Sequence, residues 1–270
     1  MNKIWINGKI VDAQNAISSS DRGFTLGDGI FETMYFDNGN IELFEMHMIR
    51  LKSTLSFLYI NISYSHNDLI NATRKLFEEN KLSCGVVRLT VSRGCGKRGI
   101  AFNNELKATV VISVSVVDRF QAPVKICTTS YIRNEKSPLS SFKMLNYTDS
   151  IMAFNDAKMK GFGDALMLNI KGNVSCTTTA NIFLIKGNNL ITPSLKSGCL
   201  PGIIRSVVLN IAKKNNLNVA ETDVKIEHMK TADSVFITNS IIRLKKIIGF
   251  EDTNYDLENK VMLNIEKELI

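Results

Sequence analysis

The chain has 270 residues. Because a typical domain has about 150 residues, we expect two domains or one large one. Hydrophobic residues make up 44% of it and charged residues 22%, which is typical of a folded globular protein and excludes a disordered, collagen-like or low-complexity chain. The net charge is +7, but Lys and Arg are scattered along the sequence, so the charge favours an anionic small molecule as ligand over nucleic acid.

Cysteine usage and hydropathy indicate the compartment. The five cysteines are odd in number, widely spaced and without a CxxC pair, which argues against a disulfide framework and against a zinc site. The N-terminal segment lacks the apolar core of a secretory signal, and no window approaches the ~18 uninterrupted apolar residues of a membrane span. The sequence therefore predicts a cytoplasmic protein that does not bind a membrane.

The first part of the chain is expected to be rich in β structure, with two amphipathic helices in its middle. The expected elements, in chain order, are a hairpin around Asn7-Gly8, a second hairpin with strands at 33–36 and 41–44, helices within 45–59 and around 69–77, and strands at 86–91 and 108–117. This pattern ends near residue 118.

The stretch 118–123 contains Pro123 and breaks the pattern of strands and helices. We interpret 119–123 as a linker between an N-terminal domain at 1–118 and a C-terminal domain at 124–270. The elements expected in the second domain are a strand at 124–129, a helix at about 146–160, strands at 164–170 and 180–186, a helix after Pro201, and further strands and short helices to the end. Both domains are thus expected to mix α and β structure.

A glycine-rich segment at 94–99 matches the GxGxxG pattern of dinucleotide-binding proteins. That function requires the third glycine to open a helix, whereas the sequence from Ile100 onwards predicts a loop and a strand. We therefore interpret the match as chance. The loop does place Lys97 and Arg98 where they could meet a substrate carboxylate.

Two further segments carry candidate chemistry that their local pattern leaves open. Lys143 stands between a polar loop and a predicted helix, where a lysine is usually solvated but can also be a catalytic amine. Gly202, Ile203 and Ile204 follow Pro201 at a predicted helix start, and the free N–H groups there favour a phosphate. Every helix N-terminus shares that property.

These segments also form an ordered set. The set consists of 22–24 (RGF), 27–33 (GDGIFET), 45–51 (EMHMIRL), 143–147 (KMLNY), 172–174 (GNV) with 181–183 (NIF), and 200–203 (LPGI). In this order the segments resemble the class IV, or fold type IV, pyridoxal-phosphate enzymes, and the resemblance covers nearly the whole chain. The family includes branched-chain and D-amino-acid aminotransferases and aminodeoxychorismate lyases.

The resemblance implies a fold, a cofactor and a set of site residues. The implied fold is a mixed α+β, two-domain architecture with a smaller N-terminal α+β domain and a larger C-terminal β-barrel-like domain with helices, assembled as a homodimer. Lys143 would attach pyridoxal 5'-phosphate covalently and later move the Cα proton. The groups implied for the cofactor phosphate are Arg50, the backbone N–H groups of Ile203 and Ile204, and Ser240. Arg98 would bind the carboxylate of a small-molecule substrate.

One position departs from the family pattern. Where the family carries a glutamate beside the pyridine nitrogen of the cofactor, this chain has Cys176, and no acidic residue occurs from 165 to 220. A thiol is a weak, neutral partner, and transamination depends heavily on the protonated ring. Aminodeoxychorismate lyases release an aromatic product, which supplies driving force of its own, and 92–99 (SRGCGKRG) is most similar to the lyase pattern.

The sequence therefore predicts a lyase that converts 4-amino-4-deoxychorismate to 4-aminobenzoate and pyruvate. A D-amino-acid or branched-chain aminotransferase is the alternative within the family. A pyridoxal-phosphate-binding protein without catalytic activity is a further alternative, against which the intact Lys143 argues.

Overall fold

The computed structural model describes residues 2–14, 16–102, 106–120 and 122–269. Its contacts divide the chain into two compact units, one comprising 1–118 with 143–146 and the other comprising 119–142 with 147–270. Gln121, which belongs to the expected linker, lies outside the described residues. Each unit is described by itself.

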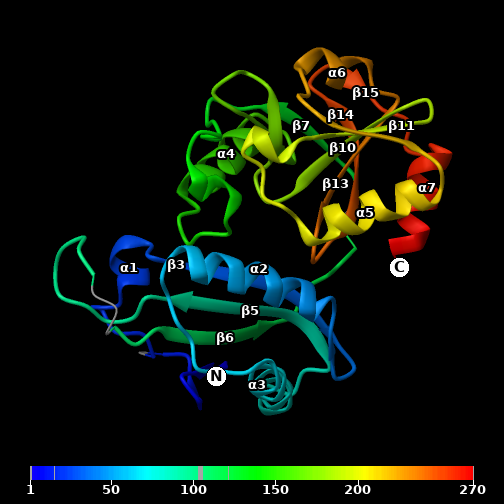
Figure 1. The fold of residues 1–270 in the computed structure, drawn as a ribbon. Helices are drawn as coiled ribbons and strands as arrows, with labels where there is room; N and C mark the ends of the chain where they lie inside the picture. Colours follow the sequence, from blue (N-terminus) through cyan, green and yellow to red (C-terminus); the bar gives the residue numbers. More distant parts are fainter. Residues whose placement is uncertain (1, 15, 103–105, 121, 270) are drawn as a thin grey trace. The chain divides into compact units, whose positions relative to one another are not determined.

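The first unit is a sheet with helices packed on it. Its elements are β1 (Lys3–Ile6), β2 (Lys9–Asp12), α1 (Arg22–Leu26), β3 (Gly29–Asp37), β4 (Asn40–Ile41), α2 (Phe44–Phe57), α3 (His66–Glu79), β5 (Cys84–Ser92) and β6 (Thr109–Ser115). Among the described residues the sheet has six strands in the order β2-β1-β6-β5-β3-β4. Figure 1 shows α2 running along this sheet.

The first expected hairpin is present, whereas the second differs from the prediction in its returning strand. Asn7 and Gly8 both adopt positive φ, 45° and 92°, as a tight two-residue turn requires, and Trp5 pairs with Ile10 across it. In the second hairpin the returning strand β4 is only two residues long. Leu43 takes a φ of 51° and serves as N-cap, so Phe44 begins α2 instead of ending a strand.

The core of the first unit follows the alternation of side chains along β3 and β5. Ile30 and Met34 of β3 are buried in one apolar cluster with residues of both α2 and α3. Since strand side chains alternate between faces, Glu32 points to the same helix-covered side, and Phe31 points to the opposite side. Consecutive residues of β3 therefore serve two different environments.

The segment 143–146 is bound to β3 through its backbone. Phe31 N–H donates to the Lys143 carbonyl, and Leu145 N–H donates to the Gly29 carbonyl, each at 3.0 Å. This short antiparallel contact places Lys143 in the first unit, although the helix that follows it belongs to the second.

The second unit is built on a long, curled sheet. Its elements are β7 (Val124–Thr128), a 3-10 turn at Pro138–Ser141, α4 (Thr148–Met159), β8 (Asp164–Leu168), β9 (Val174–Thr177), β10 (Asn181–Lys186), β11 (Asn189–Pro193), a 3-10 turn at Leu195–Ser197, α5 (Ile203–Lys214), β12 (Asn218–Thr222), α6 (Ile226–Thr231), β13 (Ser234–Asn239), β14 (Arg243–Phe250), β15 (Thr253–Asn254) and α7 (Lys260–Leu269). The strands follow the order β12-β11-β10-β13-β14-β7-β8-β9, and β15 pairs with β14.

Curvature brings the two edges of this sheet together. Val174 in the last strand donates its N–H to the carbonyl of Val224, two residues beyond the first strand, at 2.7 Å. The sheet therefore closes most of a barrel, as the family resemblance implied. One face carries α5 and α7, which lie side by side (Figure 1) and share an apolar cluster with Phe183 and Phe236.

Strand β9, which carries Cys176, has no counterpart among the expected elements. All four of its residues are buried, so it lacks the alternation of polar and apolar residues that marks a half-buried strand. Among the described residues, no helix is long and apolar enough to cross a membrane.

Candidate active site

Lys143 lies against an aromatic ring in the first unit. Its Nζ is 4.3 Å from the centroid of the Phe31 ring, and the Arg88 guanidinium carbon is 3.6 Å from the same centroid. Phe31 is buried, and its backbone holds that of Lys143. The backbone pairing thus fixes the position of the Lys143 backbone, and cation–π attraction holds the Lys143 side chain against the Phe31 ring.

Arg50 is oriented by a buried carboxylate. Its Nε donates to Glu32 Oε1 at 2.8 Å and its Nη2 to Oε2 at 2.5 Å, a bidentate pair, while His47 Nδ1 lies 2.7 Å from Oε2. Glu32 is only 2% exposed. Burial would raise the pKa of Glu32, but the hydrogen bonds from Arg50 and then His47 outweigh it and hold the pKa below its ordinary value. Glu32 is thus an ionised anchor for Arg50.

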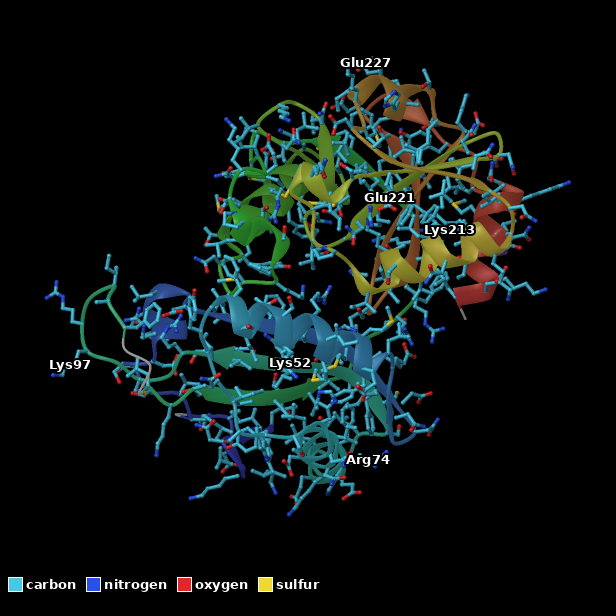
Figure 2. All side chains as sticks on the ribbon, in the orientation of Figure 1. Lys52, Arg74, Lys97, Lys213, Glu221 and Glu227 are labelled. Atoms are coloured by element: carbon cyan, nitrogen blue, oxygen red, sulfur yellow. The ribbon has the colours of Figure 1, made fainter. Side chains whose placement is uncertain are left out.

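Arg98 lies on the exposed loop between β5 and β6. No helix follows Gly99 in the described part of the loop, which confirms that the GxGxxG match is not a dinucleotide-binding turn. Figure 2 shows the neighbouring Lys97 on this loop, which projects from the sheet of the first unit. The two cations are therefore accessible to a small anionic molecule.

In the second unit, the N-terminus of α5 has the features of an anion site. Gly202 is the N-cap and supplies no side chain to accept from the first N–H groups of Ile203 and Ile204. A Cβ on Gly202 would lie 2.0 Å from Asn181 Oδ1, so this position has no room for a larger residue. The Asn181 amide also donates to the Leu200 carbonyl at 2.9 Å and holds the approach to the helix.

Thr238 places an unpartnered hydroxyl on the same side. It pairs directly with Asn181 across β10 and β13, and in an antiparallel pair opposite side chains share a face. Thr238 is 1% exposed, and within the described residues its Oγ1 has no hydrogen-bond partner. Ser240, two residues further on, lies in the turn that follows β13. A buried hydroxyl without a partner is costly unless a ligand supplies one.

Cys176 is a buried, neutral thiol. It lies in an apolar cluster with Cys199 and with Ala153 and Ala157 of α4. Burial raises its pKa to about 11, which the nearby Arg133 offsets only in part. The thiol therefore stays protonated at pH 7 and offers no negative charge to a neighbouring group.

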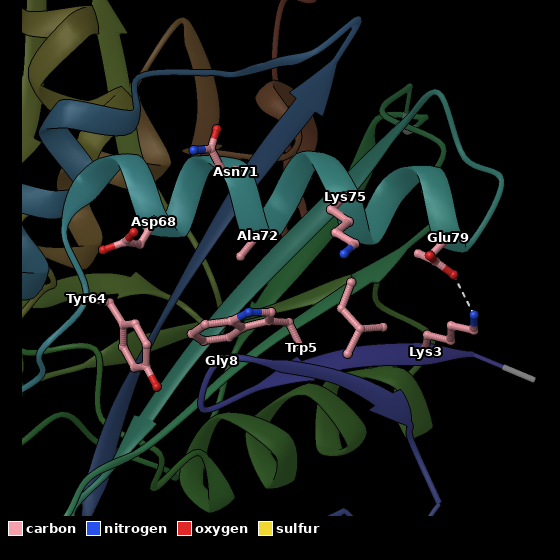
Figure 3. A pocket seen from close by; sticks show the side chains of 10 residues that line it. Lys3, Trp5, Gly8, Tyr64, Asp68, Asn71, Ala72, Lys75 and Glu79 are labelled. Carbon is pink, nitrogen blue, oxygen red and sulfur yellow. Dashed lines mark hydrogen bonds and ion pairs between the residues drawn. The ribbon is translucent and has the colours of Figure 1, made fainter.

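Two cavities are lined by other residues. One, of about 550 Å³, lies between α3 and the first hairpin, with Trp5 and Tyr64 in its wall (Figure 3). Of its charged groups, Lys3 pairs with Glu79, and Asp68 accepts from Ser65 at the start of α3. The other, of about 470 Å³, is lined by Ile237 and Lys245, which point away from α5. Neither is lined by a residue that the sequence pattern assigned to the site.

Each unit carries one feature that a phosphorylated cofactor bound to a lysine requires. The uncapped start of α5 beside the unpartnered Thr238 hydroxyl suits a phosphate, and Lys143 supplies an amine. The sequence pattern gave Thr238 and Asn181 no role in the site, because only the pairing of β10 with β13 brings them to α5. Taken separately, the two units thus carry the groups that an enzyme with a lysine-bound, phosphorylated cofactor requires.

Comparison with known proteins identifies the family. Residues 29–247 match the family model described as amino-transferase class IV, and the chain belongs to that family. A putative branched-chain-amino-acid aminotransferase of Methanocaldococcus jannaschii is 31% identical over 99% of this chain and 93% of its own. The aminodeoxychorismate lyase of Bacillus subtilis is 28% identical over 93% of this chain and 88% of its own.

A solved structure agrees with the fold. The putative 4-amino-4-deoxychorismate lyase of Legionella pneumophila superposes with a TM-score of 0.90, at 26% identity and with 96% of each chain covered. The protein is therefore a pyridoxal-phosphate-dependent enzyme with the fold type IV architecture that the sequence motifs implied.

Proposed function

We propose that this enzyme is a 4-amino-4-deoxychorismate lyase, which releases 4-aminobenzoate and pyruvate. The observation that carries the proposal is the neutral thiol of Cys176, buried and with its pKa raised to about 11, at the position of the family's glutamate. A relative and a structural neighbour bear the lyase name, and the segment 92–99 has the lyase pattern.

The chemistry of the two reactions supports this choice. Bound pyridoxal phosphate supplies a ring that withdraws electrons from the substrate through its amine nitrogen, and a carboxylate beside the ring strengthens that effect. A thiol does not strengthen this electron withdrawal. Transamination needs the full effect twice per cycle, so the thiol disfavours transamination. Lyase turnover forms an aromatic ring, and its atoms balance without water or an oxidant.

The residues take the following roles in the proposal. Lys143 attaches the cofactor and then moves a proton on its Nζ from the amine-bearing ring carbon of the substrate to the methylene carbon of the departing three-carbon unit. Arg50, the N–H groups of Ile203 and Ile204, and Ser240 bind the phosphate. Arg98 binds a substrate carboxylate, and the enzyme acts as a homodimer.

An aminotransferase is the second candidate. Relatives named as branched-chain and D-alanine aminotransferases match at 31% and 28% identity, much like the lyase. Against this stands Cys176, together with Ile100 two residues after Arg98, where D-amino-acid aminotransferases tend to have histidine.

Paired assays separate the candidates. Purified enzyme is incubated with 4-amino-4-deoxychorismate, and separately with D-alanine or leucine plus 2-oxoglutarate, and 4-aminobenzoate and keto acids are measured. We expect 4-aminobenzoate and little keto-acid exchange. Efficient exchange without 4-aminobenzoate would establish the aminotransferase, and binding of the cofactor without either product would establish a catalytically inactive protein.

Covalent attachment tests the role of Lys143. Borohydride reduction followed by peptide mapping is expected to recover the pyridoxyl group on Lys143, and Lys143→Ala is expected to abolish both attachment and turnover while the circular dichroism spectrum is unchanged. Recovery of the label on another lysine would refute the assignment.

A further inference from the structure

Two buried arginines share one aspartate at the base of the loop that carries Arg98. Asp28 Oδ2 accepts from Arg22 Nε and from Arg93 Nε, each at 2.8 Å, and its Oδ1 accepts from Arg93 Nη2 at 3.0 Å. The side chains of Arg22 and Arg93 are 5% and 6% exposed. Burial would raise the pKa of Asp28, but the hydrogen bonds from Arg93 and Arg22 outweigh it and keep the carboxylate ionised.

The rest of the Arg22 guanidinium binds the backbone of the loop. Its Nη1 donates to the carbonyl oxygens of Gly99 at 3.0 Å and Ala101 at 3.3 Å, and its Nη2 donates to that of Ile100 at 3.0 Å. Three successive carbonyl groups directly after Arg98 are thus held by one side chain.

Arg93 holds the loop through an aromatic ring. Its guanidinium carbon is 3.6 Å from the centroid of the Phe102 ring, and its Nη1 donates weakly to the Tyr59 carbonyl at 3.5 Å. Phe102 is 44% exposed, and this stacking attaches it to the fold.

The backbone of the loop before Lys97 is also held by hydrogen bonds. Arg22 N–H donates to the Gly94 carbonyl at 2.9 Å, and Gly96 N–H donates to the Ser20 carbonyl at 3.3 Å. Gly94 has a φ of 92°, and a Cβ there would lie 1.9 Å from the Lys107 carbonyl oxygen. Lys97 and Arg98 therefore lie, exposed, between two anchored stretches of backbone.

The arrangement is not itself an anion site. Every nitrogen of both guanidinium groups already donates to a protein acceptor. An arginine whose guanidinium N–H groups all donate to the protein stabilises the backbone instead of recognising a ligand.

We propose that Arg22, Asp28 and Arg93 form a clamp that fixes the loop 94–102 and thereby positions Arg98 for the carboxylate of the substrate. The clamp residues are positioning residues, and the part of the inference that concerns Arg98 rests on the proposed function. The clamp itself rests only on the contacts described above.

Limited digestion with trypsin tests the clamp without any need for activity, because Lys97 and Arg98 are themselves cleavage sites. Arg22→Lys keeps the positive charge, but an ammonium cannot reach three carbonyl groups and Asp28 together. In the cofactor-loaded enzyme we expect cleavage at these residues to accelerate by about tenfold, because it follows the population of the opened loop. Cleavage at the exposed Lys171, in the other unit, serves as internal reference and should not change.

Two further variants make the digestion specific. Phe102→Ala leaves the buried charges in place and is expected to accelerate the same cleavage to a smaller extent, which keeps the test usable if Arg22→Lys folds poorly. Arg74→Lys is the matched control, since Arg74 also donates to a backbone carbonyl, that of Gly39, but far from the loop. Unchanged cleavage in both Arg22→Lys and Phe102→Ala would overturn the clamp.

A pair of double variants tests the link to Arg98. Arg22→Lys should raise KM for 4-amino-4-deoxychorismate by about tenfold with little change in kcat, as expected when a binding contact is lost. In an Arg98→Gln background the same substitution should have no further effect on KM. An equal rise in both backgrounds would overturn the positioning of Arg98. If wild-type enzyme forms no 4-aminobenzoate, the proposed function fails, while the digestion still decides the clamp.

Discussion

Cys176 is the residue at which the resemblance implied a departure from the family's glutamate. Because the thiol is neutral at pH 7, Cys176→Glu should introduce a carboxylate beside the cofactor ring and raise the pKa of the ring nitrogen by about 1 to 3 units. We expect transamination of D-alanine or leucine to increase and 4-aminobenzoate formation to change less. The protonation state of the nitrogen is read by NMR with labelled cofactor.

A neighbouring thiol provides the control for that substitution. Cys127 lies in the same apolar cluster, and Cys127→Ala should leave the nitrogen signal and both activities near those of wild type. If Cys176→Glu also leaves all three unchanged, Cys176 does not contact the ring, and the main reason to prefer the lyase is lost.

The buried hydroxyl of Thr238 gives a second prediction for a single residue. Thr238→Val keeps the shape of the side chain and removes an Oγ1 that has no partner among the described residues. The cofactor-free enzyme should gain about 1 kcal/mol in unfolding free energy, while the affinity for pyridoxal phosphate falls. Denaturant titration and cofactor titration measure the two effects. Lower stability with unchanged affinity would show that the hydroxyl has a structural partner instead.

In the proposed site, the start of helix α5 binds the cofactor phosphate. Gly202→Ala places a Cβ against Asn181, so Asn181 or the first turn of the helix must move. We expect the affinity for pyridoxal phosphate to fall by at least roughly tenfold and that for pyridoxal, which lacks the phosphate, to stay nearly the same.

The capping residue of another helix controls for general loss of stability. Ser65 accepts from Asp68 N–H at the start of α3, and Ser65→Ala should cost about 1 kcal/mol of stability without changing either affinity. An equal loss of both affinities in Gly202→Ala would mean that the glycine supports the fold and not the phosphate.

Elements also show what the sequence could and could not predict. The Asn7-Gly8 turn, α2 and α3 follow from local patterns, because their signals lie within a few residues of each other. Strand β9 was missed because full burial removes the alternation that would reveal it. Helix α2 began earlier than expected because a non-glycine residue, Leu43, adopts the positive φ that starts it.

The residues of the candidate site also divide into those that local patterns predicted and those that they did not. Lys143 and Arg50 stand in motifs that the sequence pattern recognised, but their partners come from pairing over long distances. The carboxylate of Asp28 binds Arg93, 65 residues away, and Thr238 reaches α5 only through the register of β10 with β13. Local patterns do not encode such register, so the positioning groups could not be predicted from them.

For the whole molecule, the distribution of buried charge predicts how stability depends on pH. Glu32 and Asp28 both lie in the first unit, and in both the pKa in the folded state is lower than the ordinary value. The unfolded chain therefore binds protons at a higher pH than the folded one. The stabilisation they provide is complete above the ordinary carboxyl pKa of about 4 and is lost as the pH falls through the lower folded values.

The single tryptophan makes this loss measurable in the unit where it arises. Trp5 is buried in the core of the first unit, so its fluorescence during denaturant unfolding reports that unit.

Cofactor-free wild type should lose stability steeply from pH 5 to pH 2. Glu32→Gln, which leaves Arg50 without its ionised partner, should be less stable by about 3 kcal/mol at pH 7 and show a shallower dependence on pH. Glu79→Gln removes an exposed pair with Lys3 and should leave the stability nearly unchanged. Equal slopes for wild type and Glu32→Gln would show that the buried carboxylate of Glu32 does not set the acid sensitivity of this unit.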